Sequence, residues 1–164
     1  MYKCALIFII LLFIKGAFAT SINKIFIKGN QRIESNTILS YLNIKKNKEI
    51  SDEDLNAVFK DLFATGLFSD ISFEFKNNSL FIKVVENPII NRIALEGNKR
   101  IDDDDILPEI FLRPRDIFTL NKVKNALQTV LGIYRGNGRY AAIVEPKVIY
   151  LEQNRVDLIF EIEE

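Results

Sequence analysis

The sequence predicts an α+β protein of two tandem β-α-α-β-β domains, each a three-stranded sheet with two helices on one face. Two observations lead to this prediction. First, one pattern occurs twice, because residues 25–33 (IFIKGNQRI) reappear 68 residues later as residues 93–101 (IALEGNKRI). Second, the hydrophobic periodicity changes in the same order after each copy, from strand to helix and then to two further strands.

The repeat sets the expected domain boundaries. Residues 25–42 and 93–110 share seven identities in 18 aligned positions, and each copy closes with a similar alternating strand, at 80–86 and 158–164. We therefore predict one domain at 20–87 and a second at 88–164. The joint is expected near Asn87-Pro88, because a proline disfavours helix at the residue before it.

In the first copy, residues 24–28 alternate as a strand, and Gly29-Asn30 can form a turn that needs positive φ. Ser35 is expected to cap a short helix. The run from Ser51 to Asp54 resembles a capping box at the start of a second helix, which Gly66 ends. The apolar face of that helix is predicted to hold Leu55, Val58, Phe59, Leu62 and Phe63.

Two strands follow, alternating around Ile71 to Phe75 and Leu80 to Val84 with a turn at Asn77-Asn78. The 13 phenylalanines are interpreted as core residues, because a domain this small needs large side chains to bury. In the second copy, the final strands are expected around 140–150 and 155–163. The apolar helix face there is predicted to hold Val123, Ala126, Leu127, Val130, Leu131 and Tyr134.

Two further clusters are interpreted as structural. The acids from Asp102 to Asp105 lack the alternating ligands of a Ca²⁺ loop and precede an apolar pair, which is typical of a helix N-terminus. The glycines between Gly132 and Gly138 lack the ending of a phosphate-binding loop and suit the end of a helix. The Arg113-Pro-Arg115 segment is interpreted as a solvated loop.

The first 19 residues have the pattern of a secretory signal peptide. Lys3 supplies a positive start, residues 4–14 are continuously hydrophobic, and Ala17 and Ala19 are small residues at the positions that a signal peptidase reads. The alternative is an uncleaved anchor, but Lys15 interrupts the run well short of the roughly 20 residues that span a membrane. We therefore predict cleavage after Ala19 and export.

The composition argues against a catalytic, metal-binding or nucleic-acid-binding role. Removing Lys3 and Lys15 leaves 20 basic and 22 acidic residues, a net charge of −2, so no nucleic-acid partner is expected. The chain has no histidine, and its one cysteine lies in the signal segment, so the usual ligands of zinc, haem and copper are missing. We predict no catalytic residue, no metal and no cofactor. The expected function is that of a binding and assembly module.

Several segments together resemble the POTRA domains of outer-membrane protein assembly factors. They are residues 54–71, with the run Leu-Phe-Ala-Thr-Gly, residues 85–93 at the joint, Gly97 to Lys99, and Asn154 to Leu158. The resemblance covers residues 22–164. It implies a periplasmic scaffold at the outer membrane that receives unfolded outer-membrane proteins and partner lipoproteins, and passes clients to a β-barrel. The sequence contains no barrel strands before it ends at Glu164, so we interpret it as the N-terminal piece of a longer protein.

The resemblance also implies that the third strand of each unit is central and the second lies at an edge, where β-augmentation could bind clients. The first candidate edge comprises Ser69, Asp70, Ile71, Ser72, Phe73, Glu74, Phe75 and Lys76. The second extends from Tyr140 to Tyr150 and includes Tyr140, Ala141, Ala142, Ile143 and Val144, although Pro146 removes one donor. The alternative is that both are ordinary strands. If the Ser72 N–H faces outward, Ser72→Pro is expected to weaken client binding and spare the core.

Other functions remain open on the sequence alone. A TamA-like or two-partner secretion transporter would use the same POTRA fold for different clients. A structural bridging module of the FtsQ type would be expected to carry a membrane anchor. An enzyme that uses carboxylates alone is a residual alternative, although no recognisable motif places a pair of acids.

Overall fold

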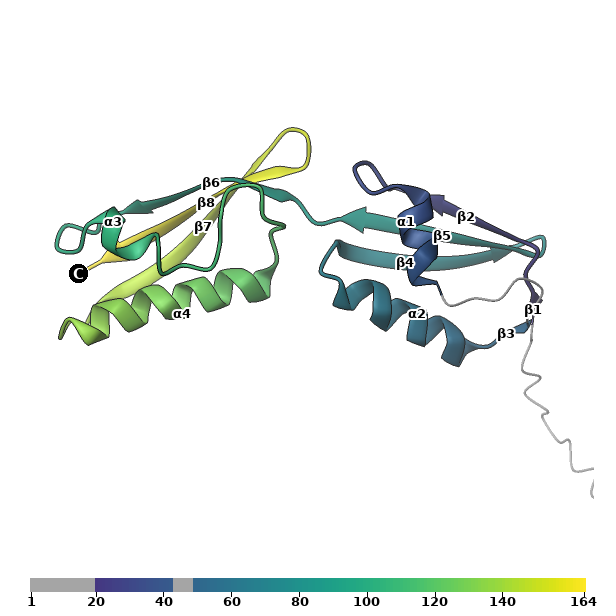
Figure 1. Ribbon diagram of the computed structural model, residues 1–164, viewed down its shortest axis with the longest axis horizontal. Coiled ribbons are helices and arrows are strands. Elements are labelled where there is room, and N and C mark those ends of the chain that lie inside the picture. The colour runs from purple at the N-terminus through teal and green to yellow at the C-terminus, as the bar shows by residue number, and fades with distance from the viewer. Residues whose placement is uncertain (1–19, 43–48) are drawn as a thin grey trace, which may run out of the picture.

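The computed structural model describes residues 20–42 and 49–164. It contains two three-stranded sheets arranged end to end, each covered by helices on one side (Figure 1). The first sheet has the order β2-β5-β4 and the second β6-β8-β7. In each sheet the first strand pairs in parallel, and the second strand antiparallel, with the central third strand. The predicted α+β fold of two β-α-α-β-β units is confirmed.

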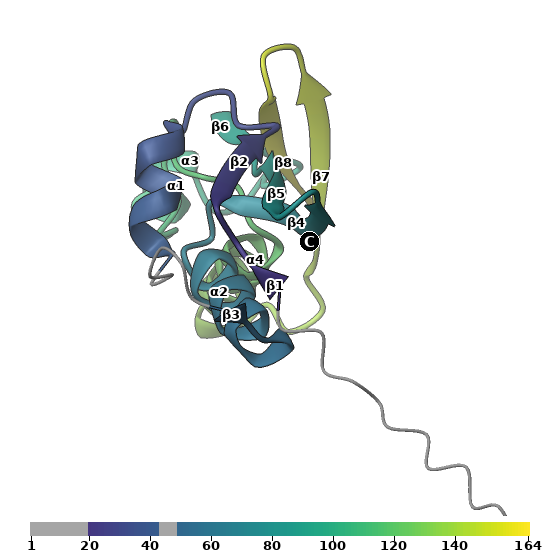
Figure 2. The same cartoon turned by 90° about the vertical axis from the view of Figure 1, so that its right-hand side faces the viewer.

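The elements of the first unit are β2 (Lys24–Lys28), α1 (Ser35–Tyr41), α2 (Asp52–Ala64), β4 (Phe68–Lys76) and β5 (Ser79–Glu86). Two short strands, β1 (Thr20–Ser21) and β3 (Glu49–Ile50), pair with each other beside them. The elements of the second unit are β6 (Ile89–Glu96), α3 (Asp103–Ile106), α4 (Leu120–Gly136), β7 (Ile143–Leu151) and β8 (Arg155–Glu163). Viewed along the length of the molecule, the helices of both units lie on the same side of the strands (Figure 2).

Each unit has its own hydrophobic core between its sheet and its helices. The central strands supply the most deeply buried residues, since Leu80, Ile82 and Val84 of β5 are at most 1% exposed. In the second unit, four positions of the predicted helix face are buried, namely Val123, Ala126, Val130 and Tyr134. The burial of the two units therefore follows the repeat that the sequence shows.

The repeated Gly-Asn-x-Arg-Ile segment forms the same turn in both units. Gly29 and Gly97 have φ of +88° and +89°, and a Cβ at either position would lie about 2 Å from a carbonyl oxygen of the central strand. The side-chain amides of Asn30 and Asn98 donate hydrogen bonds of 2.7 and 3.0 Å to the carbonyl oxygens of the isoleucines that end the motif. The glycine therefore allows close approach, and the asparagine closes the turn.

The helix starts were predicted with mixed success. The capping box at Ser51 is confirmed, since the Ser51 hydroxyl accepts from the Asp54 N–H and the Asp54 carboxylate accepts from the Ser51 N–H. The acids after Asp102 do open a helix, α3. The predicted cap at Ser35 is wrong, because Glu34 holds the N-cap position and makes no side-chain capping bond. Ser35 instead accepts a hydrogen bond from the Asn30 amide.

The aromatic core prediction is partly wrong. Phe59 and Phe63 of α2 are 37% and 50% exposed, and they stack on each other with ring centroids 5.5 Å apart. A three-stranded sheet covers only a narrow stripe of α2, so Val58 and Leu62 take the buried positions. Phe111, in the loop after α3, is 94% exposed.

Candidate functional site

The first candidate edge lies where the sequence placed it. Residues Ser69 to Lys76 all belong to β4, which pairs with β5 on one side and, within residues 20–42 and 49–164, has no strand on the other. The pairing is continuous from Asp70 to Lys76, after an irregularity near Phe68. The outer edge of β4 is therefore a continuous row of backbone groups in strand geometry.

The second candidate edge is shorter than predicted. Strand β7 begins at Ile143, whereas Tyr140, Ala141 and Ala142 lie in the turn after α4. Ile143 already pairs with Glu163 at the end of β8, so the residues before it have no partner strand opposite them. Only Ile143 and Val144 of the five residues named for this edge are in the strand.

The hairpin between β4 and β5 determines which N–H groups face outward. Asn77-Asn78 is a two-residue loop with φ of 49° and 55°, the geometry of a type I′ turn. In such a hairpin the flanking residues, Lys76 and Ser79, form a hydrogen-bonded pair, and bonded pairs recur at every second residue. Ser72 is opposite Lys83 in this register, so the Ser72 N–H faces β5. Ser72→Pro would therefore break a bond between β4 and β5, so this substitution cannot be used to test client binding at the outer edge.

The outward N–H groups of β4 belong to Ile71, Phe73 and Phe75. The second unit supports this assignment, because Pro146 on β7 is opposite Phe160 and stands at the position that matches Phe73. A proline on an edge strand is tolerated where its missing N–H would have faced solvent. Of the three, Phe75 has the most exposed side chain, at 41%.

The edge of β6 is partly closed by the chain itself. The N–H of Ile90 donates to the backbone carbonyl of Asp116 (2.9 Å), and the N–H of Arg115 donates to the Ile90 carbonyl (2.7 Å). Ile89 and Ile117 also form an isolated bridge. The sequence did not indicate that residues 115–117 lie along the edge of β6, since only Arg113 to Arg115 were interpreted, as a solvated loop.

Glu86, the last residue of β5, anchors the first turn motif. Its carboxylate accepts hydrogen bonds from the backbone N–H groups of Gln31 (2.7 Å), Arg32 (3.0 Å) and Ile33 (3.0 Å), and from the Arg32 Nε (3.1 Å). Burial alone would raise the pKa of Glu86. The backbone hydrogen bonds and the Arg32 charge outweigh burial and hold the pKa below its ordinary value.

The matching residue of the second unit, Glu164, accepts from the Arg100 N–H and from the Tyr134 hydroxyl, both at 2.9 Å. Burial and this hydrogen bond raise the pKa of Tyr134. Both units therefore use a glutamate at the C-terminal end of the central strand to hold the turn that follows the first strand.

Replacing Glu86 with glutamine is expected to lower the free energy of unfolding of the first unit by about 2 kcal/mol at neutral pH, because the ionised acceptor of several bonds is lost. The lowered pKa means that the carboxylate stabilises the fold fully above its unfolded pKa, near 4.5, and less as the pH falls through its folded value. The difference from the native chain should therefore shrink in acid. Urea unfolding at neutral pH and at about pH 3 measures this; a difference independent of pH would contradict it.

The joint between the units is held from both sides. The Asn154 amide, at the tip of the β7–β8 hairpin, donates to the Glu86 carbonyl (2.9 Å), and the Asn154 carbonyl accepts from the Ile89 N–H (3.0 Å). The Asn87 amide donates to the Gly66 carbonyl (2.9 Å). These bonds tie residues 86–89 to both domains, so the joint is more than a simple extended linker.

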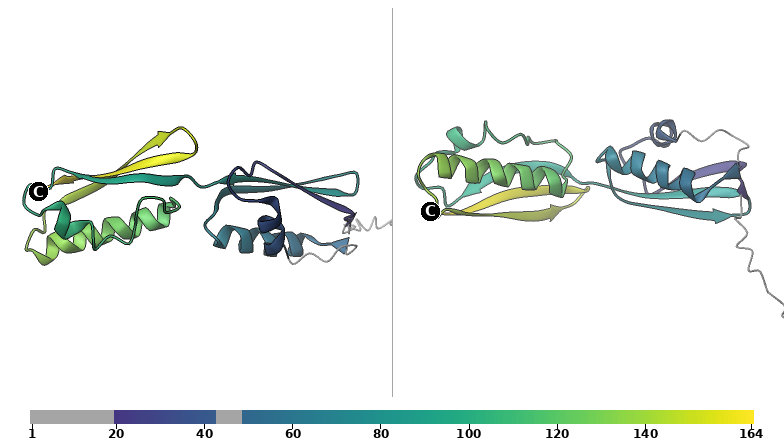
Figure 3. Two further views of the ribbon diagram at one scale, coloured as in Figure 1. Left: turned by 45° about the horizontal axis from the view of Figure 1, so that its top comes forward. Right: turned by 90° about the horizontal axis from the view of Figure 1, so that it is seen from below.

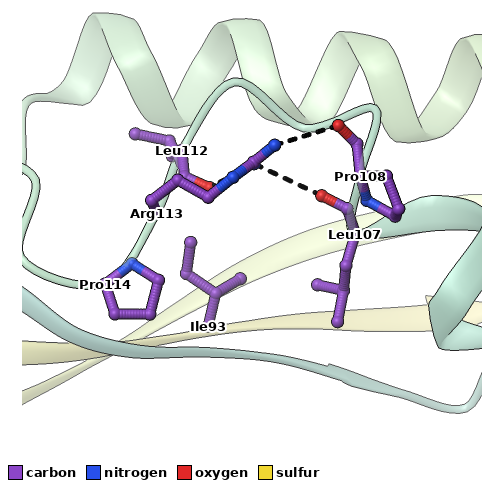
Figure 4. Close-up of a pocket in the computed structure, with 6 residues that line it drawn as sticks. All are labelled: Ile93, Leu107, Pro108, Leu112, Arg113 and Pro114. Carbon is purple, nitrogen blue, oxygen red and sulfur yellow. Dashed lines mark hydrogen bonds between the residues drawn. The ribbon is translucent and has the colours of Figure 1, made fainter.

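A cavity of about 290 Å³ lies beside β6, lined by Ile93, Leu107, Pro108, Leu112, Arg113 and Pro114 (Figure 4). The Arg113 guanidinium donates to the carbonyl oxygens of Leu112 (2.8 Å), Pro108 (3.1 Å) and Ile110. Its donors are therefore used to hold the loop together, and we assign it no role in binding an acidic partner.

Within residues 20–42 and 49–164, no group of three metal-ligating side chains is close enough to hold an ion. In the same part of the chain, no helix is both long and apolar enough to cross a membrane. The signal-peptide prediction, with Ala17 and Ala19, falls outside the described residues.

Comparison with known proteins gives consistent similarities. The chain is 28% identical over 149 residues to the outer membrane protein assembly factor BamA of Neorickettsia risticii, covering 90% of this chain and 20% of that protein. It is 31% identical over 147 residues to BamA of Neisseria meningitidis serogroup B, covering 88% of this chain and 18% of that protein. The chain thus spans about a fifth of the length of these curated relatives.

Solved structures share the fold. The N-terminal domain of Omp85 from Thermosynechococcus elongatus superposes with a TM-score of 0.61 at 15% identity, over 85% of this chain and 61% of that one. The POTRA1-2 structure of Omp85 from Anabaena gives 0.53 at 15% identity, over 85% of this chain and 92% of that one. The family described as POTRA, surface antigen variable number repeat, matches residues 20–87 and again residues 88–164. The chain therefore belongs to the POTRA family.

Proposed function

We propose that this chain is the periplasmic module of an outer-membrane β-barrel assembly factor, acting as a non-catalytic scaffold. Two consecutive POTRA matches and the BamA relatives support this role. Residues 1–19 would act as a cleaved signal peptide, and residues 20–87 and 88–164 would form the two working domains. In this role the chain would bind partner lipoproteins of the assembly complex. It would work together with a membrane-embedded β-barrel region.

We infer that unfolded outer-membrane proteins bind by adding a strand to β4. The observation that carries this inference is the free outer edge of β4, where the N–H groups of Ile71, Phe73 and Phe75 face away from the sheet. An unfolded barrel protein is a series of strand-forming segments, and main-chain hydrogen bonds make few demands on sequence. The edge at Ile143 and Val144 is the weaker candidate, because Pro146 interrupts its donors.

The test is the affinity of the purified chain for an unfolded outer-membrane β-barrel protein held in dilute urea. Fluorescence anisotropy should show saturable binding to the unfolded protein and none to the same protein folded in detergent micelles, whose strands are already paired. An unfolded all-helical protein of similar length is the matched control. Equal binding to that control would contradict the proposed client class, since strand addition should favour strand-forming segments.

A further inference from the structure

The outer face of the first sheet, opposite the helices, carries a compact set of aromatic and cationic side chains. Strand β2 contributes Lys24, Phe26 and Lys28, and the adjacent β5 contributes Phe81 and Lys83. We call these five residues the aromatic–lysine patch. The Phe26 and Phe81 rings stack with centroids 5.0 Å apart, and Phe26 is 43% exposed. The Lys28 Nζ lies 5.0 Å from the centre of the Phe81 ring.

The charges of the patch are not balanced within the fold. Lys28 and Lys83 are direct neighbours across β2 and β5, and like charges placed opposite each other destabilise a sheet. Among the residues that the structure describes, Lys24, Lys28 and Lys83 form no ion pair with an acid. The first sheet therefore presents cations around an aromatic pair, of which Phe26 is exposed and Phe81 is half-buried, at a cost to its own stability.

The second unit shows that the fold does not require this arrangement. At the matching positions, Arg92 pairs with Asp157 (2.6 Å) and Glu161 pairs with Lys147 (2.7 Å). The position that matches Phe81 is Ile159, which is only 5% exposed. On this face of the second unit, the charged side chains form ion pairs and the central apolar residue is buried. On the same face of the first unit, lysines that form no ion pair within the described residues surround an aromatic pair.

We propose that the aromatic–lysine patch binds a protein segment in which carboxylates flank a large apolar side chain. The apolar side chain would lie on the Phe26–Phe81 stack, and the carboxylates would reach Lys24 on one side and Lys28 and Lys83 on the other. Lys24 and Lys28 are four residues apart on one strand, about 13 Å, which suits acids two residues before and after the apolar side chain of an extended segment. Side chains on the sheet face, and not the β4 edge, would recognise this partner.

A single extended protein segment fits the aromatic–lysine patch better than an anionic membrane surface does. Glu74 of β4 borders the patch directly opposite Phe81. The outer faces of both sheets point to the same side of the elongated molecule (Figure 3), and on the second sheet that face carries Glu96 and Glu163 in addition to the ion-paired Glu161. A flat anionic surface that touched the patch would therefore also meet these carboxylates, whereas a single extended segment would not.

The experiment is an NMR titration of the purified chain with a peptide of sequence Glu-Ser-Phe-Ser-Glu. Amide shifts should change on β2 and β5 around the patch, and the Kd should rise steeply with salt. The double variant Lys24→Glu/Lys83→Glu should weaken binding about tenfold, because attractions become repulsions while the Lys28–Phe81 contact stays intact. The matched control, Lys60→Glu/Lys124→Glu, makes the same charge change on exposed positions of α2 and α4 and should bind as the native chain does.

A second variant and a second probe separate the alternatives. Phe26→Ser should weaken binding without changing its salt dependence, and the peptide Lys-Ser-Phe-Ser-Lys should not bind. Shifts confined to β4, or an unchanged Kd in the folded charge-reversal variant, would overturn the proposal while leaving client binding at the edge untouched. Cosedimentation with phosphatidylglycerol vesicles that depends on Lys24 and Lys83, without peptide binding, would assign the patch to a membrane surface and also overturn it.

Discussion

An alanine at position 97 is expected to lower the free energy of unfolding of the second unit by about 3 kcal/mol or more. Gly97 has φ of +89°, a backbone conformation that is costly for any residue with a Cβ. The added Cβ would also lie 2.1 Å from the Ile162 carbonyl oxygen of β8. That oxygen belongs to the central strand, so it cannot move away without disturbing the pairing with β6 or β7.

Gly138→Ala is the matched control, because Gly138 also has positive φ (75°) but has open space around its Cα. This variant should lose only the conformational part, about 1 kcal/mol. Urea unfolding followed by circular dichroism measures both variants. Equal losses would mean that the close approach to Ile162 contributes nothing, and would contradict the explanation given for the repeated glycine.

Phe75→Pro should weaken binding of unfolded outer-membrane protein about tenfold. Proline removes an N–H that faces away from β5, and its ring occupies the space where an added strand would lie. The internal pairing of β4 with β5 should persist, because it uses the alternate residues Ser72, Glu74 and Lys76. The effect should therefore appear in client affinity and not in the fold.

Phe75→Ala is the control for this variant, since it removes the same side chain and keeps the N–H. It should bind clients within about twofold of the native chain if main-chain bonds dominate. Circular dichroism and the thermal midpoint verify that both variants fold. Equal affinity for Phe75→Pro and Phe75→Ala would show that β4 does not accept a strand, and would leave Ile143 and Val144 as the remaining candidate edge.

The position of the candidate edge strand could be predicted from the sequence, but the backbone groups that face outward from it could not. The sequence placed a strand at residues 69–76, but it left open whether the Ser72 N–H faces outward, because that depends on how the hairpin at Asn77-Asn78 aligns two strands. It extended the second edge to Tyr140, because apolar residues before Ile143 look like a strand until the end of the partner strand is known. The hydrogen bonds of Arg115 and Asp116 with β6, and those of Asn154 at the joint, connect residues far apart in the chain. No local sequence pattern predicts them.

The sequence by itself determined the repeat, the order of its strands and helices, the capping box at Ser51 and the glycine turns, because these rest on local periodicity and backbone preference. Only the tertiary structure decided which apolar residues are buried, so that Val58 and Leu62 enter the core while Phe59 and Phe63 stack outside it. It also decided which lysines acquire partners, as the contrast between Lys83 and Lys147 shows. The physical reason is the same in both cases: burial and pairing depend on which distant strand lies alongside, and a three-stranded sheet covers only part of what the sequence offers it.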